Sequence, residues 1–447
     1  MESRRTLLKM AEKLDKVSSS FCLAKWLQVT IHLQNGHTHS CHHPETHSIP
    51  LKELEKDVSA LHNTDFKKQQ RKKMLNGIKP KECSYCWKIE KLPGENISDR
   101  AIKSADPWAA KHFDRVKSMP WDQNIKPTYL EVSFSNKCNF RCLYCAPSAS
   151  SSWAQEIKVH GPYKLEYDYL SLEELEKKKK TNIEEAGNPY IEAFWHWLPE
   201  VYPRLEHLRI TGGEPLLSDN TYKVLDYAAA NPNKKLQLSI NSNLGVSPDK
   251  LSKLIESVRV AKGNIKEFTF YTSLDTWGPS AEYIRTGLKC ETFEKNLKVL
   301  IREIPGLQVT VMCTFNALSL SSFGEFLKKV REWKKIAAKN GGQLILDTSY
   351  LKDPPFLSVL ILPKVWFYKF QLLLEDMKKG AFSEFEISKF ERLVEYFNET
   401  PRAVDEDIRN FINFIEMTDQ RRKTAFDKNF PEYLDLMNVF RAIRARK

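Results

Sequence analysis

The sequence predicts an α/β fold: a partial (β/α)6, TIM-like barrel, with an N-terminal cysteine-rich domain and a helical C-terminal region. Strand-like runs alternate with helical patterns through the middle of the chain, as in a parallel sheet with crossover helices. Polar motifs directly follow several of these strands, where the loops of a parallel barrel carry its chemistry. We therefore expect three domains, at residues 1–128, 129–350 and 351–447.

Six strand-like segments define the expected barrel. The first alternates Leu130, Val132 and Phe134 with polar residues, which is the period-2 pattern of a β-strand. The other five cover residues 207–211, 236–241, 267–273, 308–314 and 343–347. Helical patterns between them cover residues 222–230, 248–260, 292–303 and 321–338.

A cysteine-rich loop follows the first strand. Cys138, Cys142 and Cys145 stand at CxxxCxxC spacing, so three thiolates can converge on one metal centre. A structural zinc site closes with four ligands, whereas three protein ligands leave one position open for chemistry. An iron–sulfur cluster normally takes four cysteines, so three would leave one iron free. Ordinary buried cysteines, or a zinc site with a distant fourth ligand, are the alternatives.

Polar residues follow three further strands, and the barrel rule places them on the same face as the cysteine loop. Two glycines permit close approach of the backbone to a ligand, and the glutamate beside them could meet an ammonium group. Asparagine and serine side chains offer hydrogen bonds to hydroxyls and a carboxylate, and an arginine could pair a carboxylate bidentately. The strand-end residues are Gly212, Gly213, Glu214, Asn241, Asn243 and Ser273, and the arginine is Arg285 in the sequence AEYIRTG.

Four more cysteines precede the barrel. An Asn35-Gly36 turn after a strand expected at residues 26–33 would bring Cys22 and Cys41 to one end of a hairpin. Cys83 and Cys86 are two residues apart, so both sulfurs can bind one metal. The two pairs together could form a four-cysteine site, whether zinc or iron–sulfur.

Six of the eleven histidines fall between residues 32 and 47. Histidine-rich tracts can bind metals, but a solvated polar loop explains them as well. We expect the loop, with one histidine as a possible substitute cluster ligand.

Composition narrows the class of protein. The chain has 447 residues, no run of about 18 apolar residues and no apolar segment typical of a secretory signal, so we expect a cytoplasmic protein without a membrane span. Cysteines at motif spacings favour metal binding over disulfides. The net charge of +12 suggests an anionic small molecule or an acidic peptide as a partner, with nucleic acid as the alternative.

Three motifs occur in order between residues 130 and 316: CxxxCxxC with Tyr144 before its last cysteine, then GGEP, then Ser-Leu-Asp. This series of motifs resembles the core of the radical S-adenosylmethionine (radical SAM) superfamily. The resemblance implies that the three cysteines are catalytic and hold a [4Fe–4S] cluster whose open iron chelates the amine and carboxylate of S-adenosylmethionine. It implies that residues 212–214 contact the amine and that Tyr144 lies near the adenine. Asn241, Ser273 and Arg285 are implied as further cofactor contacts.

The spacing from Cys22 through Gly36 to Cys41 resembles the opening of the SPASM and twitch auxiliary-cluster domains, and residues 71–100 also look like that family. The resemblance implies one auxiliary [4Fe–4S] cluster held by Cys22, Cys41, Cys83 and Cys86. Two features depart from the family: the module precedes the core here, and the further cysteines of a full SPASM domain are missing. Structural zinc therefore stays open as the alternative.

The expected function follows from these resemblances. A reduced cluster would cleave S-adenosylmethionine to a 5′-deoxyadenosyl radical, which would remove hydrogen from a substrate, with a peptide favoured over a carbohydrate or nucleotide. The implied partners are S-adenosylmethionine and an electron donor such as a flavodoxin or ferredoxin. The alternative is a non-catalytic protein, stabilised by zinc or a cluster, that binds nucleic acid.

Overall fold

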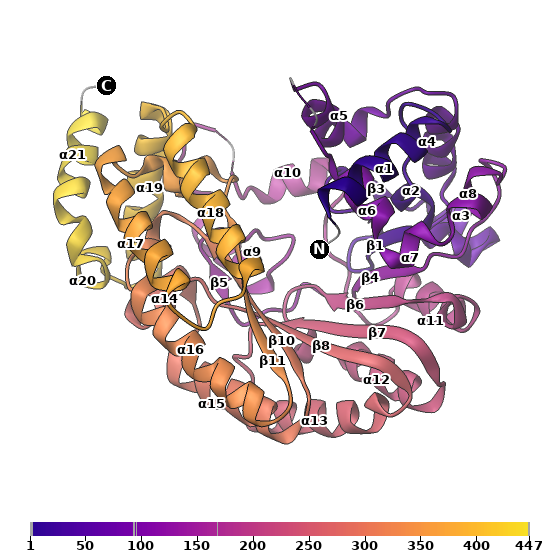
Figure 1. Cartoon of the computed structure of the whole chain (residues 1–447). Helices are drawn as coiled ribbons and strands as arrows, with labels where there is room; N and C mark the ends of the chain where they lie inside the picture. Colours follow the sequence, from indigo (N-terminus) through magenta and orange to yellow (C-terminus); the bar gives the residue numbers. More distant parts are fainter. Residues whose placement is uncertain (1–2, 93, 95, 168, 446–447) are drawn as a thin grey trace.

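The chain folds around one nine-stranded sheet (Figure 1). The computed structural model describes residues 3–92, 94, 96–167 and 169–445. Six adjacent parallel strands, in the order β11-β10-β8-β7-β6-β4, confirm the predicted (β/α)6 pattern. They are β4 (Tyr129–Ser133), β6 (His207–Thr211), β7 (Asn233–Ser242), β8 (Ile265–Ser273), β10 (Gln308–Phe315) and β11 (Gln343–Tyr350).

The four predicted crossover helices are present, with ends within one helical turn of the expected bounds. They are α12 (Asp219–Ala230), α13 (Pro248–Lys262), α15 (Cys290–Glu303) and α16 (Phe323–Lys339). Each buries an apolar stripe, as for α13 with Leu251, Leu254, Ile255 and Val258. In Figure 1 these helices lie along the outer side of the curved sheet.

The two faces of the sheet differ in polarity. On β6, Leu208 and Ile210 are fully buried, whereas His207, Arg209 and Thr211 between them are half-buried. The same alternation holds along β8 and β10. Parallel strands covered on both faces are usually apolar throughout, so this pattern shows that the inner face is polar and partly open to solvent.

The N-terminal region adds three strands to the same sheet. β1 (Gln28–His32) pairs in parallel with β4, and β2 (His37–His39) and β3 (His47–Ser48) follow it in antiparallel fashion. The strand expected at residues 26–33 is therefore shorter, because α2 (Ala24–Leu27) takes its first residues. Gly36 turns the chain as expected, with φ +64°, and a Cβ there would lie 2.1 Å from the Tyr190 ring.

The rest of the N-terminal region is helical and has a core of its own. Its helices are α1 (Arg4–Asp15), α3 (Leu51–Lys56), α4 (Asp65–Leu75), α5 (Ser84–Glu90), α6 (Asp99–Ala105), α7 (Pro107–Ala110) and α8 (Phe113–Lys117). A hydrophobic cluster separate from that of the barrel joins Leu14, Trp26, Met74, Trp87 and Phe113. The sheet nevertheless crosses residue 128, and Val29, Ile31 and Leu61 of the N-terminal region belong to the hydrophobic cluster of the barrel.

The C-terminal helices close the other end of the sheet (Figure 1). They are α17 (Phe367–Lys378), α18 (Glu384–Glu399), α19 (Asp405–Arg422), α20 (Phe426–Asn429) and α21 (Leu434–Ala445). The buried Glu386 of α18 accepts a hydrogen bond from the Leu346 N–H of β11 at 2.7 Å and pairs with Lys334 at 2.7 Å. Covering β11 in this way protects the edge of the sheet.

A long connection joins β4 to β6. It contains α9 (Ser151–His160), α10 (Leu172–Lys177) and α11 (Pro189–Val201). Trp153 of α9 and Trp197 of α11 belong to the main hydrophobic core rather than to a separate one. In the part of the chain that the structure describes, no helix combines the length and the apolar character that a membrane span requires.

Candidate cluster and cofactor sites

The three cysteines after β4 face one pocket at the carboxyl ends of the strands. Cys138, Cys142 and Cys145 are each partly buried and free. A short ladder between β5 (Arg141–Cys142) and β9 (Arg285–Thr286) holds their loop. The pocket is also lined by residues predicted from the strand-end motifs, namely Tyr144, Gly212, Gly213, Asn241, Asn243, Ser273 and Arg285. The structure thus brings together every predicted residue of this site except the Glu214 side chain.

The glycine pair packs against the cysteine loop. The Gly213 N–H donates to the Ser135 carbonyl at 3.0 Å. Gly212 has φ +132°, and a Cβ on Gly213 would lie 2.4 Å from the Lys137 carbonyl oxygen. These glycines are therefore required by contact with the protein's own backbone, a reason that the sequence argument did not include.

Glu214 points away from the pocket, contrary to the expectation that its carboxylate meets an ammonium group. Its side chain is 2% exposed and accepts backbone N–H groups from Leu216 at 3.0 Å and Asn243 at 2.6 Å. Burial raises the pKa of this carboxyl to about 7. Glu214 therefore ties the loop after β6 to the loop after β7, which orients residues that do line the pocket.

Arg285 is held by a carboxylate of the protein itself. Asp275 is fully buried, and its Oδ2 lies 2.9 Å from the Arg285 Nε. The Tyr144 hydroxyl donates to Asp275 Oδ2 at 2.7 Å and accepts from Arg285 Nη2 at 2.5 Å. Arg285 Nη1 lies 3.5 Å from the Cys142 sulfur. The predicted bidentate pairing of Arg285 with a ligand carboxylate is therefore replaced by pairing with Asp275, the third residue of the Ser-Leu-Asp motif.

The two asparagines make contacts around the pocket. The Asn241 side-chain oxygen accepts from Arg209 Nε at 3.0 Å. The Asn243 amide donates to Asn139 Oδ1 at 2.9 Å and lies 3.9 Å from the Cys138 sulfur. Asn241 thus connects the pocket to the polar inner face of the sheet, and Asn243 supports the cysteine loop.

Burial keeps the cysteine thiols protonated in the protein alone. It raises the pKa of Cys138 and of Cys145 to about 12. Metal ligation requires thiolates, so loading this site would release protons. Three convergent thiols with hydrogen-bond donors beside them fit a cluster bound by three cysteines.

The C-terminal helix α19 contacts the cysteine loop through Arg422. Arg422 is fully enclosed, pairs with the equally buried Glu156 at 3.0 Å and donates to the Arg141 carbonyl at 2.9 Å. The Trp153 indole N–H donates to the Cys142 carbonyl at 2.8 Å. Nothing in the sequence around residues 419–422 shows which buried partner this arginine meets.

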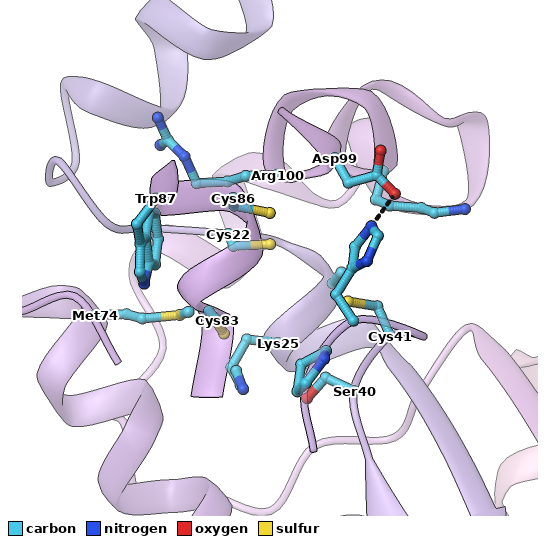
Figure 2. A pocket seen from close by; sticks show the side chains of 14 residues that line it. Cys22, Lys25, Ser40, Cys41, Met74, Cys83, Cys86, Trp87, Asp99 and Arg100 are labelled. Carbon is cyan, nitrogen blue, oxygen red and sulfur yellow. Dashed lines mark hydrogen bonds and ion pairs between the residues drawn. The ribbon is translucent and has the colours of Figure 1, made fainter. Parts of the chain in front are cut away.

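The four N-terminal cysteines line a single cavity (Figure 2). Cys22 precedes α2, Cys41 follows β2, and Cys83 and Cys86 flank the start of α5. Burial raises the pKa of Cys41 and Cys86 to about 12 and that of Cys83 to about 11. The cavity also contains the positively charged Lys25 and Arg100, which would stabilise thiolates there.

The spacing of these sulfurs bears on the choice of metal. In a tetrahedral zinc site with Zn–S bonds of about 2.3 Å, the sulfurs lie about 3.8 Å apart. Among the described residues, His42, His43 and Asp99 form a group whose ligand atoms all lie within 4.8 Å of one another. This group contains no cysteine. The thiolates of a [4Fe–4S] cluster bind different irons, so their sulfurs lie farther apart than those around one zinc ion.

Four of the six histidines between residues 32 and 47 lie in strands rather than in the expected solvated loop, whereas His42 and His43 lie in the loop after β2. His37 is 4% exposed and His39 is 8% exposed, because both lie in β2. His32 and His39 stack, with their Nε2 atoms 3.0 Å apart. Burial lowers the pKa of His32 to about 3 and that of His39 to about 4, so both are neutral. His43 lines the cysteine cavity without replacing a cysteine.

Comparison with known proteins identifies the central region. Residues 132–330 match the sequence model of the radical SAM superfamily. Over 155 residues the chain is 30% identical to the GTP 3',8-cyclase of Aliarcobacter butzleri, which covers 34% of this chain and 35% of that protein. Over 214 residues it is 27% identical to the GTP 3',8-cyclase of Sulfurimonas denitrificans, which covers 45% of this chain and 52% of that protein. The matched segments thus span 35% and 52% of the length of these two relatives.

Among solved structures, Streptococcus suis SuiB bound to S-adenosylmethionine is similar at 13% identity and a TM-score of 0.37, covering 79% of this chain and 69% of that one. The matched segment contains Cys138, Cys142, Cys145 and all the strand-end motifs. A radical SAM domain implies a [4Fe–4S] cluster and S-adenosylmethionine, and the pocket after β4 holds the residues that fit them. The central region of the chain, residues 132–330, therefore matches the radical SAM superfamily in sequence, including the cysteine loop and the strand-end motifs.

Proposed function

We propose that this chain uses Cys138, Cys142 and Cys145 to hold a [4Fe–4S] cluster that, with S-adenosylmethionine bound, supplies a 5′-deoxyadenosyl radical for hydrogen abstraction from a polar substrate. One observation carries the proposal: three free, partly buried cysteines and the strand-end motifs line one pocket at the carboxyl edge of a parallel sheet. In parallel barrels this edge carries the active site.

The residues around the pocket have distinct roles in this proposal. Tyr144 is fixed by Asp275 and Arg285, so its ring can offer a constant surface to the adenine. The backbone of Gly212 and Gly213 is free of side chains and can approach the amine closely. Ser273 lines the same pocket and offers a hydroxyl for hydrogen bonding.

The polar inner face of the sheet supports a polar substrate. Glu131, Arg209 and Tyr271 lie on β4, β6 and β8 of this face, and the Arg209 guanidinium lies 4.5 Å from the centre of the Tyr271 ring. Arg209 contacts Asn241, which also lines the cysteine pocket. A substrate on this face would meet both charges and hydrogen-bonding groups next to the proposed radical source.

Two substrate classes deserve testing. A peptide is expected from the resemblance of the N-terminal cysteines to SPASM and twitch modules. A nucleotide is the second candidate, because relatives of the central region are named GTP 3',8-cyclase. Mass spectrometry of reactions with nucleoside triphosphates and with peptides would separate them, since only the true substrate class should be altered or carry deuterium into 5′-deoxyadenosine.

The reaction itself is tested without knowing the substrate. Anaerobically reconstituted protein should be brown, contain about eight irons per chain if both cysteine sites hold [4Fe–4S] clusters, and release 5′-deoxyadenosine from S-adenosylmethionine when a strong reductant is added. Omitting the reductant is the control. Colourless, zinc-loaded protein that forms no 5′-deoxyadenosine would favour the non-catalytic nucleic-acid-binding alternative.

We further propose that residues 1–128 form an auxiliary-cluster domain, residues 129–350 the catalytic core and residues 351–447 a helical extension. The four cysteines in one cavity, with Lys25 and Arg100 beside them, support a second [4Fe–4S] cluster. The net charge of +12 suits an acidic electron donor such as a flavodoxin or ferredoxin.

Replacing Cys83 by alanine should remove about four irons per chain while leaving some cleavage of S-adenosylmethionine at the core site. The reason is that Cys83 lines the N-terminal cavity only. Cys290→Ala is the matched control, because Cys290 is a buried cysteine that lines neither cysteine pocket. Iron analysis of both variants provides the measurement. Unchanged iron in Cys83→Ala would show that the auxiliary cluster is wrong.

A further inference from the structure

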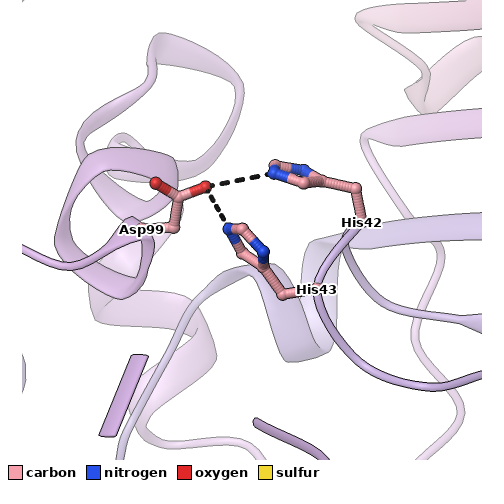
Figure 3. Close-up of side chains that lie close together, drawn as sticks. All are labelled: His42, His43 and Asp99. Carbon is pink, nitrogen blue, oxygen red and sulfur yellow. Dashed lines mark hydrogen bonds and ion pairs between the residues drawn. The ribbon is translucent and has the colours of Figure 1, made fainter. Parts of the chain in front are cut away.

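Three side chains lie close together at the edge of the cavity lined by the four N-terminal cysteines. His42 and His43 follow Cys41 in the loop after β2, and Asp99 begins α6 (Figure 3). The His43 Nε2 lies 2.8 Å from Asp99 Oδ2, and the His42 Nε2 lies 3.4 Å from the same oxygen. Two separate segments of the chain therefore bring two imidazoles and one carboxylate together.

We infer that His42, His43 and Asp99 bind one divalent transition-metal ion of the zinc class, separate from the proposed iron–sulfur clusters. One ligand atom from each residue lies within 4.8 Å of the other two. At metal–ligand distances of about 2.1 Å, two ligand atoms lie about 3.0 Å apart in octahedral geometry and about 3.4 Å apart in tetrahedral geometry. The two distances to Asp99 Oδ2 are close to these values.

The surroundings hold the ligands in place. The His43 ring stacks on Tyr85 with a centroid distance of 3.7 Å and an interplanar angle of 14°. The His42 and His43 rings lie 4.0 Å apart. Fixed ring orientation raises metal affinity because little freedom is lost on binding. Metal binding would replace the His43–Asp99 hydrogen bond, and the imidazole proton would move from Nε2 to Nδ1.

The site has room for further ligands. The His42 side chain is 60% exposed, whereas those of His43 and Asp99 are 15% and 22% exposed. Water or an anionic substrate group can therefore complete the coordination from the His42 side. Two imidazoles and one carboxylate favour zinc, nickel or iron(II) over magnesium and calcium, which prefer oxygen ligands.

The test uses cluster-loaded protein that is dialysed against zinc chloride, after which zinc and iron are counted. We expect one zinc per chain with unchanged iron content, and no comparable binding of magnesium. X-ray absorption at the zinc edge should show nitrogen and oxygen neighbours and no sulfur at about 2.3 Å. Zinc that displaces iron, or that has sulfur neighbours, would overturn the proposal.

Variants separate this site from the cysteine site. His42→Ala and Asp99→Asn should each weaken zinc binding by about 10-fold or more, whereas His196→Ala, an exposed histidine on α11, should not. His42 is mostly exposed, so its replacement should leave the fold intact. Cys83→Ala should keep the zinc even if the auxiliary cluster is lost, which distinguishes failure of one proposal from failure of the other. Equal zinc affinity in wild type and His42→Ala would refute the site.

Discussion

Replacing Cys138 by alanine should abolish formation of 5′-deoxyadenosine and remove about four irons per chain. Cys138 lies in the pocket after β4, and the remaining two cysteines cannot hold a cluster that needs at least three protein thiolates there. The Phe140 N–H lies 3.4 Å from its sulfur, so the loop already presents that sulfur to a backbone donor. Reverse-phase chromatography of the reaction with S-adenosylmethionine and dithionite measures the product.

Comparison with Cys83→Ala makes this experiment specific. Both variants should lose about four irons per chain, but only Cys138→Ala should lose cleavage of S-adenosylmethionine. Far-UV circular dichroism should be unchanged in both, because alanine adds no bulk and keeps the backbone hydrogen bonds at each position. If Cys138→Ala retained cleavage at the wild-type rate, the assignment of the catalytic cluster to this loop would be untenable.

The sequence was informative about this site because strand ends have a fixed geometry. The carboxyl ends of parallel strands share one edge of the sheet. The motifs at the ends of the strands expected at residues 130–134, 207–211, 236–241 and 267–273 therefore had to converge. Local periodicity identified those strands but could not identify every partner. β1 pairs with β4 about 100 residues further along the chain, and no local pattern encodes such a long-range pairing.

Direction and burial of polar side chains were harder to predict. Glu214 was expected to face a ligand, yet the backbone N–H groups of Leu216 in its own loop and of Asn243 in the neighbouring loop bind its carboxylate. His37 and His39 were expected in solvent, yet strand pairing buries them. In each case the residue type allows both outcomes, and the decision depends on donors contributed by distant segments.

Arg285→Gln should destabilise the protein strongly. The arginine and Asp275 side chains are 6% and 0% exposed, and removing the cation would leave a buried carboxylate without its counter-charge. Breaking such a pair costs about 3–5 kcal/mol of unfolding free energy. Thermal and denaturant unfolding of wild type and variant measure the loss. An unchanged unfolding free energy would mean that Asp275 does not depend on this arginine.

The double variant Arg285→Gln with Asp275→Asn separates stability from function. Removing both charges leaves no uncompensated ion, so much of the lost stability should return. Activity should not return, because the Tyr144 hydroxyl loses a charged donor at 2.5 Å and the Cys142 sulfur loses one at 3.5 Å.

The positive charge of Arg285 beside the Cys142 sulfur also favours a reduced cluster. The reduction potential of the cluster in Arg285→Gln should therefore fall, as measured by EPR-monitored redox titration. A double variant with wild-type 5′-deoxyadenosine formation would show that the Tyr144–Asp275–Arg285 network serves folding alone.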